Sequence, residues 1–442
     1  MRAEKKISQR CDRFRNLTID PSIVRPRRRR VTDQRGHRSV TLALDPVITS
    51  RMRGFPSEKP TQVKADGLRR YFQLMFRRLC WGGPILLILV ESIRVKMLRV
   101  KCLLAAISVG LAVLLGACAG RLSQGMLVPV AQSAEGTSRV QVLAATTRQR
   151  STADPGEMFN GERAEEVSYA AVTVSIPPDS ARKIGEIQWP ESLPGDPRRD
   201  FVTVSANYID KQGLVSAVSA TAKQTGRSKV LVFVHGFNNR FDDAVYRFAQ
   251  IVHDAKAQGI PVLFTWPSRG EIKLRAYTYD RESANYSRDA FEQLLATLAA
   301  NPNVKEINIV AHSMGNWVTL EALRGMSIRG GKIGGKIKNV MLVAPDVDVD
   351  VFRTQIQRMG TARPRFALFV SQDDKALGLS QEIWGGVPRL GEINPAQEPY
   401  QSELRKENIE VFDLTKLKGN AHDRAFEDIT DVLVMVKDRT GE

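Results

Sequence analysis

A serine at position 313 lies in a setting that would make it a nucleophile. It is the centre of Ala311-His312-Ser313-Met314-Gly315, a variant of the G-x-S-x-G pattern in which Ala311 replaces the first glycine. The β-branched run 307–310 before it predicts a buried parallel strand, and residues 316–324 after it have helical apolar spacing. A sharp turn between strand and helix would lift the serine hydroxyl above the sheet, while small neighbours let the two backbones pass closely.

A general base for that serine has few candidates, because the chain has five histidines. Four of them lie in an arginine-rich N-terminal region, on a predicted helix face, or where two predicted strands end: His37, His253, His235 and His312. His422 remains, in a polar loop between a last strand (409–414) and a closing helix (424–437). It also lies downstream of the serine and of the aspartates that could orient it. We expect His422 to be the base.

The acid that would orient this histidine has three candidates. Residues 366–370 predict the penultimate strand, and Asp373 and Asp374 follow it. A carboxylate at that position can reach the Nδ1–H of the histidine, fix its tautomer and stabilise the imidazolium. Asp374 fits the usual length of the turn better than Asp373. Asp346, which follows the predicted strand 340–344, is the other alternative, one strand earlier in the sheet.

With these segments in view, the chain resembles the α/β-hydrolase superfamily. It looks most like a bacterial branch of uncharacterised esterase- or lipase-like lipoproteins. The resemblance covers about residues 138–437. It rests on the segments 144–148, 174–178, 235–239, 265–268, 311–315, 344–346 and 370–377.

The resemblance implies a fold, a reaction and an oxyanion hole. The fold is α/β, with a mostly parallel central sheet and helices on both faces. The oxyanion hole would use the N–H groups of Met314 and of Phe237, with Asn238 a close second to Phe237. Ser313 would attack a carboxylic ester of a small molecule or lipid, His422 would take its proton, and water would resolve the acyl-enzyme without a cofactor.

Several alternatives remain open on the sequence alone. Thioesterase, peptidase or acyltransferase activity would use the same residues, and a non-catalytic envelope binding protein could share the fold. Trp266, Phe237 and Tyr277 are candidates either for an apolar pocket or for the core.

The positive charge is concentrated at the front of the chain. The formal net charge is +17, and residues 1–96 account for +15 of it, with 23 Lys+Arg against 8 Asp+Glu. The remainder is nearly neutral, which argues against nucleic acid as a partner. Residues 1–96 show no periodicity that could build a core, which predicts a disordered basic segment. They could be an extension upstream of a true start at Met97, or a cytoplasmic arm.

Residues 97–118 have the pattern of a bacterial lipoprotein signal. A basic start at Met97 precedes an uninterrupted apolar run, 102–115, and Leu115-Gly116-Ala117-Cys118 closes it. We expect a signal peptide at 97–117, lipid on Cys118 and a tether at 118–137. In a Gram-negative host this predicts the periplasmic face of the outer membrane; an ordinary membrane anchor is the alternative. The other cysteines precede Cys118, so no disulfide or cysteine metal site is expected in the body.

The body, residues 138–442, has the length of one α/β domain. Apolar runs that alternate with helical patterns predict a mostly parallel sheet, with residues 138–225 at its first edge. The glycine-rich stretch 325–335 predicts a flexible loop, and its glycines do not lead from strand to helix in phosphate-binding order. No cluster of metal-ligating residues stands out. The predicted strands are 230–234, 261–266, 307–310, 340–344, 366–370 and 409–413.

Overall fold

The computed structural model describes residues 125–132, 134–154, 156–331 and 333–433, all within the unit Ser108–Glu442. The strands are β1 (Ser138–Arg150), β2 (Phe159–Ile176), β3 (Val202–Ile209), β4 (Lys229–Val234), β5 (Ile260–Thr265), β6 (Glu306–His312), β7 (Ile337–Val343), β8 (Arg365–Val370) and β9 (Glu410–Asp413). The α-helices are α4 (Lys211–Thr225), α5 (Phe241–Asp254), α6 (Leu274–Ala300), α7 (Gly315–Gly330), α8 (Val349–Met359), α9 (Lys375–Ile383), α10 (Tyr400–Lys406) and α11 (Arg424–Glu427). Two short 3₁₀ turns are η5 (Asp179–Ala181) and η6 (Leu390–Glu392).

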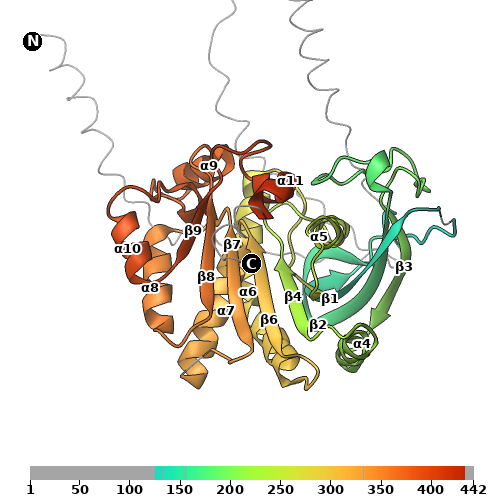
Figure 1. Ribbon diagram of the computed structural model, residues 1–442, viewed down its shortest axis with the longest axis horizontal. Helices are drawn as coiled ribbons and strands as arrows, with labels where there is room; N and C mark the ends of the chain where they lie inside the picture. Colours follow the sequence, from blue (N-terminus) through green and yellow to red (C-terminus); the bar gives the residue numbers. More distant parts are fainter. Residues whose placement is uncertain (1–124, 133, 155, 332, 434–442) are drawn as a thin grey trace, which may run out of the picture. The chain divides into compact units, whose positions relative to one another are not determined.

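A single nine-stranded sheet organises the described residues, in the order β3-β2-β1-β5-β4-β6-β7-β8-β9 (Figure 1). The seven strands from β1 to β9 in this order pair in parallel, while β2 pairs antiparallel with both β1 and β3. The three earliest strands therefore form one edge, as predicted. The mostly parallel sheet of the predicted α/β fold is confirmed, and its carboxyl ends share one edge, where sites of open α/β sheets form.

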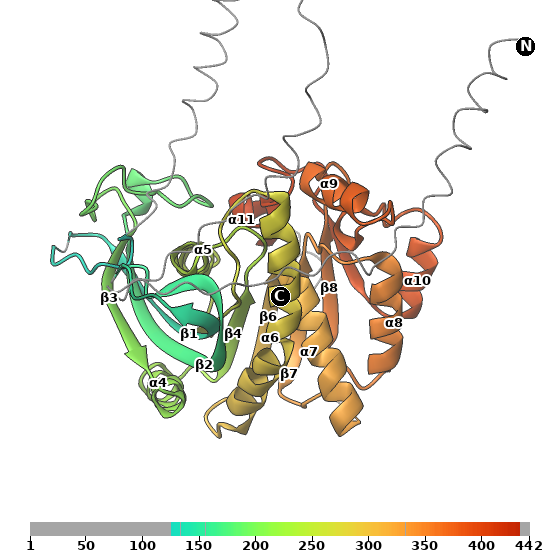
Figure 2. The ribbon, with the colours of Figure 1, turned by 180° about the vertical axis from the view of Figure 1, so that it is seen from behind.

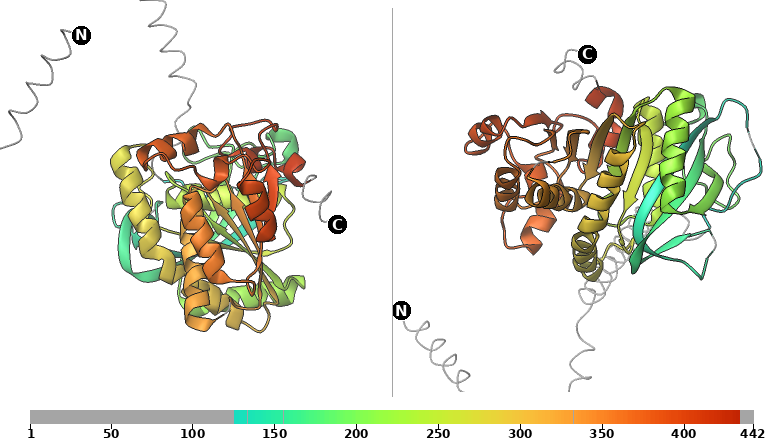
Figure 3. Two further views of the ribbon diagram at one scale, coloured as in Figure 1. Left: turned by 90° about the vertical axis from the view of Figure 1, so that its left-hand side faces the viewer. Right: turned by 90° about the horizontal axis from the view of Figure 1, so that it is seen from below.

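Helices cover both faces of the sheet, because its central strands are apolar on both sides. Side chains alternate along β4, so Val230, Val232 and Val234 enter the core layer beneath α4, α6, α7 and α8, while Phe233 enters the layer beneath α5 and α11. Figure 1 shows α5 and α11 in front of the sheet, and Figure 2 shows α6 and α7 in front from the opposite side. Figure 3 gives the same layers from the side and from below.

One predicted loop is helical in the structure. We expected residues 325–335 to be a flexible loop, but α7 continues to Gly330 and ends where Gly331 adopts a left-handed conformation with φ 66°. That prediction was wrong for residues 325–330. Packing of α7 against α6 explains the difference, since Met326 packs against the core and Arg329 pairs with Glu292 of α6, and these contacts outweigh the weak helix propensity of glycine.

The chain packs against the domain before β1 begins. Met126 and Leu127 are 2% and 1% exposed, in the core layer beneath α5. The carbonyl of Met126 accepts hydrogen bonds from Thr203 and Tyr246, both at 3.0 Å. The segment expected as a tether, 118–137, therefore contains residues that are built into the domain.

The remaining expectations for the front of the chain lie outside the described residues. These are the basic segment 1–96, the signal peptide 97–117 and the lipid site Cys118. Within the described part of the chain, every helix is too short or too polar to cross a membrane.

Candidate active site

Ser313 occupies the turn between β6 and α7, at the carboxyl edge of the sheet. Its φ of 50° lies in the left-handed region that residues other than glycine seldom adopt. Two backbone hydrogen bonds hold this conformation: its N–H donates to the carbonyl of Val343 at 3.0 Å, and its carbonyl accepts from the N–H of Asp346 at 3.2 Å. Such strain persists only where the surroundings enforce it, and here the end of β7 does so.

Small residues around the turn provide the space that it needs. A Cβ added at Gly315 would overlap the carbonyl oxygens of Val234 and His235, so α7 can start this close to β4 only from a glycine. A Cβ at Gly236 would lie 2.8 Å from Cβ of Ser313. Ala311, where the pattern usually has glycine, is fully buried inside β6, and its methyl group is accommodated there.

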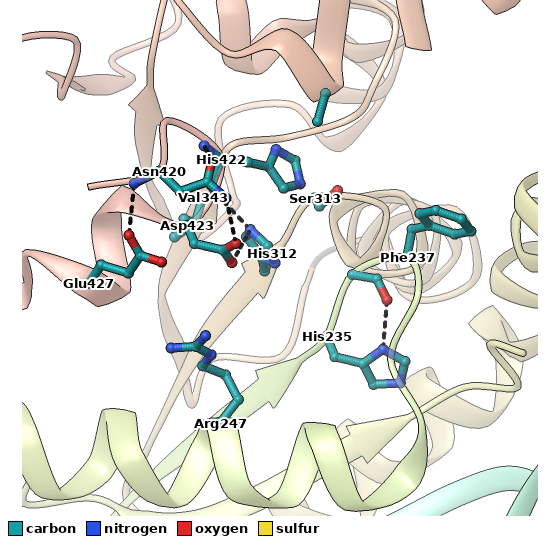
Figure 4. A network of polar contacts seen from close by, with 12 residues as sticks. His235, Phe237, Arg247, His312, Ser313, Val343, Asn420, His422, Asp423 and Glu427 are labelled. Atoms are coloured by element: carbon teal, nitrogen blue, oxygen red, sulfur yellow. Dashed lines mark hydrogen bonds and ion pairs between the residues drawn. The ribbon is translucent and has the colours of Figure 1, made fainter. Parts of the chain in front are cut away.

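His422 and Asp374 meet across the ends of two strands. His422 lies in the loop after β9, Asp374 follows β8, and Nδ1 of the histidine is 2.7 Å from Oδ2 of the aspartate. The other oxygen of Asp374 caps α9 by accepting the N–H groups of Ala376 and Leu377 at 3.0 and 3.2 Å. Since the carboxylate accepts, Nδ1 carries the proton and Nε2 is left with its lone pair. Figure 4 shows this imidazole beside the side chain of Ser313.

The surroundings of His422 adjust its basicity. Burial acts to lower its pKa. The hydrogen bond and charge of Asp374 outweigh burial and raise the pKa above its usual value, with smaller contributions from Asp423 and Asp346. The backbone is held as well, because Nε2 of His312 lies 3.0 Å from the carbonyl oxygen of His422. Burial, and then the charge of His422, lower the pKa of His312 to about 4, so it remains a neutral donor near pH 7.

The two alternative acids have other partners. Both carboxylate oxygens of Asp373 accept from Arg424 at 2.9 Å. Asp346 accepts from Tyr277 at 2.5 Å and from Ser380 at 2.6 Å. Of the three aspartates considered from the sequence, the structure brings Asp374 to His422.

The loop after β4 lies alongside the serine. Gly236 contacts it, and the loop residue Asn238 has a φ of 58°. The N–H of Asn238 bonds the carboxylate of Asp280, whereas within the described residues the N–H groups of Phe237 and Met314 donate to no backbone acceptor. The two N–H groups expected to form an oxyanion hole are therefore available to a ligand.

A buried arginine supports this loop from below. The guanidinium of Arg148, on β1, donates to the carbonyl of Asn239 at 2.6 Å, to that of Ser268 at 2.8 Å and to the hydroxyl of Thr265 at 2.9 Å. Burial lowers its pKa to about 10, although nearby carboxylates, Asp280 foremost, act to raise it. The sequence did not indicate this role, because Arg148 was recognised only as part of the segment 144–148 that supports the family resemblance.

His235 is a structural residue of the same loop. Its Nδ1 lies 2.8 Å from the carbonyl of Gly236, and Nε2 lies 3.2 Å from the N–H of Trp266, so Nδ1 is the donor and Nε2 accepts. Burial, and then the charge of Arg148, hold its pKa well below the usual value. The ring stacks on Trp266, which is fully buried, so Trp266 belongs to the core.

A cavity of about 510 Å³ opens above Ser313 and His422, a size typical of small-molecule sites. Apolar side chains line one part of the wall, with the hydrogen-bonded Asp346 among them, and charged side chains line another part. Phe237 and Tyr277 line the apolar side, with ring centroids 5.2 Å apart, together with exposed Ile272 and Leu379. Asp243, Arg247 and Asp423 line the charged side. Across the described residues, no group of three His, Cys, Asp or Glu side chains is arranged to hold a metal ion.

Three solved structures are among those similar to parts of this chain. A lipase-esterase related protein from Clostridium acetobutylicum is 12% identical over 48% of this chain and 94% of its own, with a TM-score of 0.28. Naproxen esterase from Bacillus subtilis is 11% identical over 48% and 84%, with a TM-score of 0.25. Carboxylesterase CesB from Bacillus subtilis is 11% identical over 49% and 85%, with a TM-score of 0.26. No curated protein matches the chain significantly.

The sheet, the strained serine turn and the histidine–aspartate pair define an α/β hydrolase. The chain belongs to the family described as alpha/beta hydrolase of unknown function, DUF900, whose profile matches residues 211–435. The predicted superfamily is thereby confirmed.

Proposed function

We propose that this protein is a serine esterase that works through an acyl-enzyme. The observation that carries the proposal is the position of His422, between the carboxylate of Asp374 and the side chain of Ser313. Nδ1–H is committed to the aspartate, so the Nε2 lone pair is the group that can take the proton of the serine. The raised pKa of His422 makes it a stronger base than a free imidazole.

In this mechanism, Oγ of Ser313 attacks the ester carbonyl carbon as His422 takes its proton. The N–H groups of Phe237 and Met314 stabilise the oxyanion, an effect worth about 10²–10³ in rate per donor in comparable sites. Protonated His422 then gives its proton to the departing alcohol. Water, activated by His422, attacks the acyl-enzyme, and collapse of the second tetrahedral intermediate releases the carboxylic acid and Ser313.

Covalent labelling by a fluorophosphonate probe tests the proposal. The purified full chain should be labelled and should hydrolyse p-nitrophenyl butyrate. Ser313→Ala should abolish labelling, and Ser313→Ala and His422→Ala should each lower turnover about 10⁴-fold or more, without the losses adding in the double variant. Absence of labelling in a folded protein, or a tenth of the activity retained by His422→Ala, would contradict the assignment.

We also propose that the protein is a lipoprotein of the cell envelope, anchored through Cys118. The support is the basic start at Met97, the apolar run 102–115 and the small residues before Cys118. Two or three acyl chains would give stable attachment, whereas one would be marginal. Mass spectrometry of the mature N-terminus should find a lipidated Cys118, and Cys118→Ser should leave an uncleaved precursor. An unmodified Cys118 would overturn this proposal and leave the esterase proposal standing.

A further inference from the structure

Two opposite charges face the cavity beside His422 without forming an ion pair. Arg247 rises from α5, and Asp423 follows His422 in the chain (Figure 4). Nη1 of Arg247 donates to the carbonyl of Gly185 at 3.2 Å and to Oε1 of Gln250 at 3.0 Å. The carboxylate of Asp423 lies 3.9 Å from Nε2 of His312, and its Oδ2 accepts a 3.4 Å bond from Asn420. Both charged groups therefore keep bonding capacity toward the cavity.

The charges define the chemistry of a ligand that fits between them. An anion would be attracted by Arg247 but repelled by Asp423, which also lines the cavity. A cation would be attracted by Asp423 but repelled by Arg247. Neutral hydroxyl groups satisfy both, because a hydroxyl can accept from the guanidinium and donate to the carboxylate.

An aromatic side chain completes this part of the wall. Trp189 lines the cavity and is stacked on Tyr246, with ring centroids 5.4 Å apart and planes at 11°. Tyr246 is itself fixed by its bond to the carbonyl of Met126. A rigid indole offers an apolar surface to the C–H face of a sugar or polyol, while the charged groups bind its hydroxyls.

The charged side of the cavity also has a defined relation to the reaction. His422 must give its proton to the oxygen of the departing alcohol, so the alcohol lies on the His422 side of the ester. Asp423 is the next residue in the chain, and His312 lies between Asp423 and the serine turn. The mainly apolar part of the wall, with Leu379, Ile272 and Tyr277, whose hydroxyl group donates to Asp346, is then left for the acyl group.

We propose that Trp189, Arg247 and Asp423 form a subsite for a hydroxyl-rich alcohol, so that the substrate is an acyl ester of a sugar or polyol. This rests on the proposed esterase activity, with Ser313 cleaving the bond between the acyl carbon and the sugar oxygen. The sugar leaves as the free alcohol, and the proton it gains comes from His422.

Esters with one acyl chain and different alcohols test the subsite in the full-length protein. The set is ethyl butyrate, glucose 6-butyrate, butyrylcholine as a cationic ester and the butyryl ester of lactate as an anionic one. We expect kcat/KM for glucose 6-butyrate to exceed that for ethyl butyrate about tenfold or more. The reason is that the ethyl group cannot form the hydrogen bonds that a sugar hydroxyl forms with a charged side chain. Arg247→Gln and Asp423→Asn should each reduce this preference about tenfold. Ile328→Ser, at an exposed apolar position on α7 outside the cavity, is the matched control.

Binding to the Ser313→Ala variant separates failure of the subsite from failure of the enzyme. In calorimetric titrations, this variant should bind glucose 6-butyrate about tenfold more tightly than ethyl butyrate, whether or not the unsubstituted protein turns either over. Equal affinity, or a preference for the sugar ester that persists when Arg247 and Asp423 are replaced, would overturn the subsite. So would a preference for the lactate ester that depends on Arg247 alone. Sugar-ester binding without hydrolysis or fluorophosphonate labelling would instead contradict the esterase proposal.

Discussion

The imidazole of His312 donates from Nε2 to the carbonyl oxygen of His422 at 3.0 Å, so the residue before the serine holds the backbone of the proposed base. The same ring packs edge-on against Phe426, with centroids 5.1 Å apart. The strand that carries the serine turn and the loop that carries His422 are thereby joined by a hydrogen bond between residues 110 positions apart.

Replacing His312 by phenylalanine tests this link. The ring contact with Phe426 should survive but the donor is lost, so we expect kcat to fall about tenfold with little change in KM, as for loss of a hydrogen bond. His312→Gln can still donate and should restore most of the activity. Steady-state kinetics on both variants check the prediction, and equal defects in the two would mean that ring packing alone matters.

Asp374→Asn should change the pH dependence as well as the rate. The base acts when neutral, so activity in the unsubstituted protein should fall as the pH drops through the raised pKa of His422, above its usual 6.5. Loss of the carboxylate charge lowers that pKa, so the fall in activity at acid pH should move to lower pH. The kcat should also fall about 10²-fold or more, because the histidine tautomer is no longer fixed. Asp373→Asn, whose partner is Arg424, is the control and should leave both unchanged.

Asp346→Asn should cost less activity than Asp374→Asn. Its carboxylate holds Tyr277 and Ser380 at the cavity wall, and the weaker acceptor would loosen both. We expect a loss of about 1–3 kcal/mol in the free energy of unfolding, and a several-fold rather than hundred-fold fall in kcat/KM. Urea denaturation and kinetics measure the two effects. A larger loss of kcat than in Asp374→Asn would transfer the acid role to Asp346.

Arg148→Met should destabilise the loop that contains Phe237. The change removes a buried charge together with its hydrogen bonds to Asn239, Ser268 and Thr265, leaving buried acceptors without a donor. We expect the free energy of unfolding to fall by about 3–5 kcal/mol, measured by urea denaturation. Arg150→Met is the matched control on the same strand, where an exposed cation–π contact with Tyr208 contributes about 0.5–1 kcal/mol. Similar losses in the two variants would contradict the role of Arg148.

The sequence alone determined the local features of this protein. The buried parallel strands show as short apolar runs, and the turn at Ser313 shows because small residues must flank a serine between strand and helix. His422 could be reached by elimination among five histidines. The strands and the serine turn are readable because each depends on residues that are neighbours in the chain.

The tertiary structure decided which distant residues meet. Asp373 and Asp374 are adjacent in sequence, and their side chains turn to Arg424 and His422 respectively, a choice made by the cap of α9 and the path of the loop after β9. Arg148 reaches the loop of Phe237 only because β1 pairs with β5, more than 100 residues later. Packing also extended α7 through Gly325 and buried Met126 and Leu127, because contacts across the fold outweigh local propensity. Pairings of this kind depend on sheet register and loop geometry, which no single segment of the sequence encodes.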